Sequence, residues 1–133
     1  MKRLGYIPLF TVVLLFSFRA PANAKKFAVV GIPETQTRTT TDSAFNIVLD
    51  NNQKVSNRLV IVEDGGKYYW ETRDHDELIF TKMQRFDLFI DPKTGGYVKV
   101  IKQDNGAFAY LEHISFNDYK TFTYWGFLNV YQP

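Results

Sequence analysis

The chain has 133 residues, no cysteine, 17% aromatic residues and a formal net charge of +2. Without cysteine no disulfide can form, so the fold must be stabilised by packing. The near balance of charge argues against a nucleic-acid partner, because affinity for a phosphate backbone comes largely from clustered lysine and arginine.

Residues 1–24 have the pattern of a secretory signal peptide. Lys2 and Arg3 precede an apolar run over residues 7–18, and the small-residue ending at 22–24 predicts cleavage after Ala24. The run is about half of the ~20 residues that a transmembrane helix needs, and no later segment comes close to that length. We therefore expect no transmembrane segment in the mature chain.

Export would change the size and charge of the protein. Removing 24 of the 133 residues leaves 109, a usual size for one domain that can bury its own core. The signal takes three basic residues with it, so 16 become 13 against 14 acidic residues, and the net charge becomes −1. Because small secreted eukaryotic domains usually carry disulfides, we expect a bacterial protein in the periplasm or the medium.

The residues after the signal are rich in Val, Ile, Thr, Tyr and Phe, the residue types that favour β-strands. Residues 25–43 are predicted to form an N-terminal strand over 26–31 and then a polar loop over 33–43, which has no apolar residue. The main β domain is expected over residues 44–133. It begins with a strand in which Phe45, Ile47 and Leu49 share one face, ended by the polar residues 50–53.

Turn signals divide the remaining residues into strands at short intervals. The segments 64–66, 91–96 and 104–106 contain Gly, Pro, Asn or Asp in patterns typical of tight turns. Residues 78–91 are ambiguous, with a short helix near 82–85 as an alternative to strand. The expected strands are 57–64, 67–73, 86–90, 97–103, 107–116 and 119–132. The sequence thus predicts an all-β fold, an antiparallel meander of about seven or eight strands that forms a small sandwich or barrel.

Acidic residues surround one of the two histidines in the segment 74–77, Asp-His-Asp-Glu. Asp74, His75 and Asp76 are the residues that would hold a metal, but the spacing does not match a calcium loop. Consecutive residues of a strand also point to opposite faces, so at most alternate ones converge. We interpret the segment as a charged turn at the end of a strand, with no metal or other cofactor expected.

The second histidine, His113, follows Glu112. Imidazole titrates near neutral pH, so two histidines beside one substrate can act as general base and general acid. His75, His113 and Glu112 are therefore the candidate catalytic residues. The chain has neither a Gly-x-Ser-x-Gly nor a Ser-x-x-Lys motif that would supply a nucleophile.

Aromatic residues cluster in two strands. By alternation Tyr68 and Trp70 share one face of their strand, and Tyr124 and Trp125 lie on opposite faces of the last strand. A two-layer protein hides one face, so rings on the other face indicate a binding surface. We take Tyr68, Trp70, Arg73, Tyr124 and Trp125 as the candidate binding residues.

Three functions are consistent with these features. The first is a binding or interaction module that uses its aromatic residues on a glycan, a peptide or an envelope protein. The second is a small hydrolase or metal-dependent enzyme that uses the two histidines with neighbouring carboxylates. The third is a structural or self-assembling envelope subunit, because exposed strand edges can pair with each other. The sequence favours the first.

Overall fold

The computed structural model describes residues 24–116 and 119–133. The predicted signal peptide lies outside these residues except for Ala24. Within the described residues the chain forms nine strands and one short helix. Their bounds are β1 Lys26–Thr39, β2 Ala44–Val48, α2 Asn51–Ser56, β3 Leu59–Asp64, β4 Lys67–Trp70, β5 Asp76–Lys82, β6 Asp87–Ile90, β7 Tyr97–Lys102, β8 Phe108–Ser115 and β9 Thr121–Tyr131.

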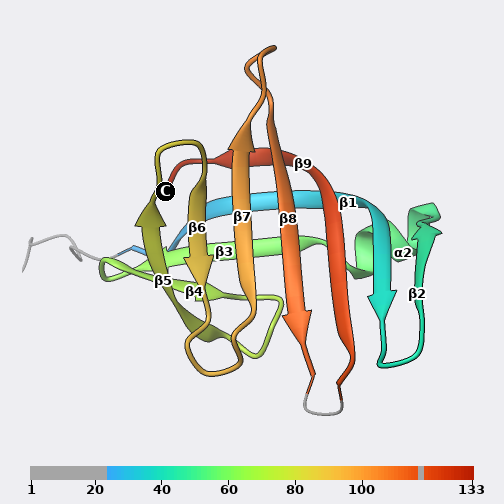
Figure 1. The fold of residues 1–133 in the computed structure, drawn as a ribbon. Coiled ribbons are helices and arrows are strands. Elements are labelled where there is room, and N and C mark those ends of the chain that lie inside the picture. The colour runs from blue at the N-terminus through green and yellow to red at the C-terminus, as the bar shows by residue number, and fades with distance from the viewer. Residues whose placement is uncertain (1–23, 117–118) are drawn as a thin grey trace, which may run out of the picture.

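Eight of the strands form a closed antiparallel barrel (Figure 1). Strands β3 to β9 pair in chain order, and β1 closes the barrel by pairing with both β3 and β9. Strand β2 is the additional strand, which pairs with the C-terminal half of β1. The all-β antiparallel fold predicted from the sequence is confirmed, and it is a barrel.

The polar loop predicted over residues 33–43 is wrong for most of its length, because β1 continues to Thr39. Residues Thr35 to Thr39 pair with β2 on one side and with β9 on the other. The pairing with β9 shifts register between Pro33 and Thr35, and such an irregularity accommodates a proline, which has no amide hydrogen for the ladder. Backbone pairing on both sides, rather than apolar side chains, holds this polar segment in the strand.

The helix α2 was not predicted. Asp50 caps it: its side chain accepts a hydrogen bond from the Gln53 amide, while the Gln53 side chain accepts one from the Asp50 amide. This reciprocal pair is a capping box, and its Asp-x-x-Gln spacing is visible in the sequence. No residue of α2 is buried, so the helix has no apolar periodicity by which to predict it.

Residues 78–91 form two strands, β5 and β6, rather than a helix. They are joined by a tight turn in which the Met83 amide donates to the Phe86 carbonyl at 2.9 Å. The predicted strand near 86–90 is confirmed as β6. The predicted hairpin at 104–106 is also confirmed, with Gly106 at a φ of 88° between β7 and β8.

The barrel interior is filled by side chains that alternate inward along each strand. Gly31 on β1 leaves room for a ring there, because a Cβ at this position would lie 2.5 Å from Cε1 of Tyr110. The packed interior is therefore shaped by large aromatic rings. Its buried members are Ala28, Val29, Leu59, Ile61, Trp70, Leu78, Phe89, Val98, Val100 and Tyr110.

Candidate functional site

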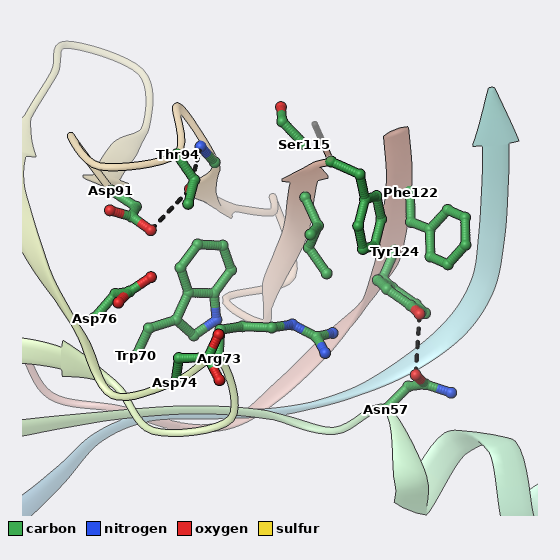
Figure 2. Close-up of a pocket in the computed structure, with 13 residues that line it drawn as sticks. Asn57, Trp70, Arg73, Asp74, Asp76, Asp91, Thr94, Ser115, Phe122 and Tyr124 are labelled. Carbon is green, nitrogen blue, oxygen red and sulfur yellow. Dashed lines mark hydrogen bonds between the residues drawn. The ribbon is translucent and has the colours of Figure 1, made fainter. Parts of the chain in front are cut away.

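The main cavity of the described residues lies at one end of the barrel. In a meander the successive turns alternate between the two ends, so the β4–β5, β6–β7 and β8–β9 connections share one end (Figure 1). A cavity of about 410 Å³ opens between them. Its lining residues are Asn57, Trp70, Arg73, Asp74, Asp76, Asp91, Thr94, Gly96, Ile114, Ser115, Phe116, Phe122 and Tyr124 (Figure 2).

Aromatic rings form one part of the cavity wall. Trp70, at the end of β4, is only 2% exposed, and Tyr124 on β9 is also buried. Phe122 lies on the same face of β9 as Tyr124, and it packs edge-on against Phe116 with ring centres 4.9 Å apart. The cavity thus presents flat apolar surfaces to a molecule inside it (Figure 2).

A buried ion pair lies beside this aromatic wall. An Arg73 guanidinium nitrogen is 2.6 Å from the Glu112 carboxylate, and Glu112 is fully buried on β8. Burial raises the pKa of Glu112 above its ordinary value, and the charge and hydrogen bond of Arg73 oppose that rise. The Trp70 indole N–H, which also lies beside the Glu112 carboxyl, opposes that rise in the same way.

Tyr124 is held by side chains from three other parts of the chain. The Gln36 amide on β1 donates to the Tyr124 hydroxyl, which donates to Oδ1 of Asn57 at 2.9 Å, next to α2. The Arg73 guanidinium lies 5.5 Å from the centre of the Tyr124 ring. Arg38 in turn donates to the Gln36 side chain at 2.7 Å. These contacts fix the position of the phenol at the cavity wall.

Three carboxylates line the other side of the cavity. Asp91 is buried and accepts hydrogen bonds from the Thr94 hydroxyl at 2.8 Å and the Lys93 amide at 2.9 Å. Burial alone would raise its pKa, but these hydrogen bonds, with a contribution from the neighbouring Asp76 carboxyl, hold the pKa of Asp91 below its ordinary value. Asp74 lies on the β4–β5 turn with a φ of 55°. This side of the cavity is therefore acidic.

The opposite end of the barrel has the reverse charge. A second cavity of about 350 Å³ lies there, between the β5–β6 turn and the ends of β7, β8 and β9. Lys82, Arg85 and Lys102 line it, with Asp87 as its acidic member. The two ends of the barrel therefore differ in the charge that they offer to a ligand.

Three of the five predicted binding residues, Trp70, Arg73 and Tyr124, meet in the main cavity. The structure places the other two elsewhere. Tyr68 packs in the interior, with its ring centre 5.3 Å from that of Phe89. Trp125 lies on the outer wall, 40% exposed. The predicted alternation is thus present on both strands. Of these aromatic residues, only Trp125 lies on the outer surface of the barrel.

Asp74 and His75 lie on the β4–β5 turn, as expected from the sequence, whereas Asp76 and Glu77 are already the first residues of β5. His75 has a φ of 56°, its Nδ1 lies 2.6 Å from a Glu71 carboxylate oxygen, and its ring stacks on Tyr69 at 4.6 Å. No group of three or more metal-ligating side chains occurs among the described residues. Asp74 and Asp76 line the cavity, whereas His75 does not.

His113 lies on the outside of the barrel. Its ring stacks on Tyr97 at 5.0 Å, its Nδ1 is 3.1 Å from the Thr123 hydroxyl, and partial burial lowers its pKa. Glu112, the adjacent residue, is buried on the other face of β8. The three candidate catalytic residues His75, His113 and Glu112 are thus not brought together at the cavity.

Two acidic residues, Asp91 and Glu112, were not assigned to this cavity and its wall from the sequence. Asp91 precedes Pro92, Lys93 and Thr94, and an aspartate at the start of such a turn commonly accepts hydrogen bonds from the next residues. Glu112 was considered only as a partner of His113, although it shares a strand face with Tyr110. Both signals are present in the sequence, but neither indicates which distant strands meet at the site.

Comparisons with known proteins give no identification. No protein-family model matches the chain, and no curated protein or solved structure is significantly similar to it. Among the described residues no helix has the length and apolar character needed to cross a membrane.

Proposed function

We propose that this chain is an exported binding protein whose ligand is a small molecule held in the main cavity. The observation that carries the proposal is the meeting of Trp70, Arg73 and Tyr124 in one cavity of about 410 Å³. Small-molecule sites usually measure roughly 300–1,000 Å³ and combine apolar walls with a few placed polar groups. The wall described above has this composition.

The position of the site supports the same proposal. The mouth of a small barrel is a common place for a ligand, because the strands fix the wall and the turns can vary. Here the hydrogen bonds of Tyr124 and the ion pair of Arg73 hold the polar groups of the wall in place. A site with fixed groups loses little conformational entropy on binding.

The two tryptophans of the chain make a direct test possible, because Trp70 lines the cavity and Trp125 lies on the outer wall. In a Trp125→Phe variant the intrinsic fluorescence reports only on Trp70, and in a Trp70→Phe variant only on Trp125. We expect ligands from a library of small molecules to change the emission of the first variant and not of the second. A response confined to Trp125 would contradict the proposal.

The hydrolase alternative is not favoured by any contact described above. Both histidines stack on tyrosines and neither lines the cavity. We therefore propose no reaction.

The self-assembling alternative is favoured by one feature, the free edge of β2. Within the described residues β2 pairs only with β1, and two of its apolar side chains are exposed, Phe45 to 48% and Val48 to 82%. Such an edge can pair with the same edge of a second copy. If it does, light scattering will show that the mass of the protein rises with concentration. The Val48→Lys variant should then have a lower mass, while the control Val55→Lys, on the surface of α2, should have the mass of the wild type. A monomer at all concentrations would remove this alternative.

A further inference from the structure

The main cavity has an excess of negative charge among the groups that face it. Asp74, Asp76 and Asp91 line it, and Arg73 is the one basic side chain in its lining. Glu112, which lies behind the wall, forms an ion pair with Arg73 at 2.6 Å and so offsets the charge of Arg73. The charge left for a ligand to meet is that of the three aspartates.

A neighbouring lysine offsets only part of this charge. Lys93 is exposed, and its Nζ lies 3.4 Å from an Asp76 carboxylate oxygen. The Lys93 side chain is largely in solvent, which screens its charge, although the Asp76 side chain is only 12% exposed; Lys93 therefore offsets only part of the charge of Asp76. Asp91 accepts hydrogen bonds from the Thr94 hydroxyl and the Lys93 backbone amide, which carry no charge, and it lies beside the Asp76 carboxyl.

The aromatic side of the cavity favours the same sign of ligand charge. The faces of Trp, Tyr and Phe rings carry partial negative charge and attract cations, most strongly where water is excluded. Phe122 and Tyr124 supply such rings across the cavity from Asp76 and Asp91, and Trp70 lies beside Asp76 (Figure 2).

Building on the proposed binding function, we infer that the ligand is a small organic amine with a ring or carbon skeleton, the chemistry of an amino sugar or an arylalkylamine. The ammonium group lies against Asp76 and Asp91, and the ring or carbon skeleton lies against Trp70 and Tyr124. The opposite end of the barrel, with its basic lining, does not offer this combination.

Two matched sets of probes test the inference in the Trp125→Phe protein, whose fluorescence reports on the cavity. Glucosamine, glucose and glucuronate share a ring and differ in charge, as do benzylamine, benzyl alcohol and benzoate. We expect glucosamine to bind at least about tenfold more tightly than glucose, and glucuronate to bind more weakly still. Benzylamine is expected to bind more tightly than benzyl alcohol, and benzoate more weakly still.

Two further measurements assign the preference to the aspartates. Asp76→Asn is expected to reduce glucosamine affinity by about tenfold and to leave glucose affinity unchanged, whereas Asp104→Asn, at the opposite end of the barrel, changes neither. The second measurement needs no variant in the site: raising the salt concentration should weaken glucosamine binding and not glucose binding.

The outcomes separate this inference from the function on which it rests. Equal or tighter binding of glucose, benzyl alcohol or either anion would overturn the inference and leave the binding function standing. Stronger competition by calcium than by sodium at equal ionic strength would also overturn it, because the aspartates would then form a metal site. No fluorescence response to any of the six probes or to the compound library would overturn both.

Discussion

Single residues of the main cavity have structural as well as binding roles, and Asp91 shows this most clearly. Its carboxylate accepts from the Thr94 hydroxyl and the Lys93 amide, and its backbone pairs with both Gly95 and Gly96, so it closes the β6–β7 turn. We expect Asp91→Ala to lower the free energy of unfolding by about 1–3 kcal/mol at neutral pH, because buried donors lose their acceptor. Urea denaturation measures this, with the exposed Asp104→Ala as a control expected to stay within about 0.5 kcal/mol of the wild type.

The pH dependence of that loss follows from the lowered pKa of Asp91. A carboxyl whose pKa is lower in the folded than in the unfolded state stabilises the fold above the unfolded pKa, and this contribution disappears as the pH falls through the folded pKa. The difference between wild type and Asp91→Ala should therefore shrink in acid. A difference that is constant with pH would contradict the assigned hydrogen bonds.

At the scale of the element, closure of the barrel depends on the contact between β1 and β9. Gly126 on β9 faces Pro33 in this pairing, and a Cβ at Gly126 would overlap the carbonyl oxygen of Ile32. We expect Gly126→Ala to lower the free energy of unfolding by about 1–3 kcal/mol, since the backbone of one strand must move. Asn129→Ala, exposed on the same strand, should change it by less than about 0.5 kcal/mol. Equal losses in the two variants would show that close approach at Gly126 is not needed for closure.

The elements also show what sequence could predict here. Strands with a continuous apolar run, such as β3, or with alternating apolar residues, such as β7, were found from local pattern alone, as were turns with Asn-Gly or Gly-Gly. The second half of β1 was missed because its partners β2 and β9 decide its conformation, and β9 lies more than eighty residues away in the chain. The sequence predicted only part of the main cavity, because distant strands also decide which side chains meet there. Alternation identified Trp70 and Tyr124, but only the closed barrel brings Asp91 to them.

For the whole molecule, we propose export, because the N-terminal sequence has the charge, apolar length and small-residue ending of a signal peptide. The full chain expressed in a bacterium should yield a protein that begins at Lys25, as measured by intact mass. A chain that starts at Lys25 should give the circular dichroism of β structure and unfold in one cooperative transition. An uncleaved protein in the cytoplasm would contradict the export proposal and leave the barrel unaffected.

Binding in the main cavity is tested most directly by NMR spectroscopy of the indole groups. The chain has two tryptophans, so a ¹⁵N-labelled sample gives two indole N–H signals, one from Trp70 in the cavity and one from Trp125 on the outer wall. On titration with glucosamine, the Trp70 signal should shift in proportion to binding while the Trp125 signal stays in place. A shift of the Trp125 signal alone would contradict the account, because the ligand would then bind outside the barrel.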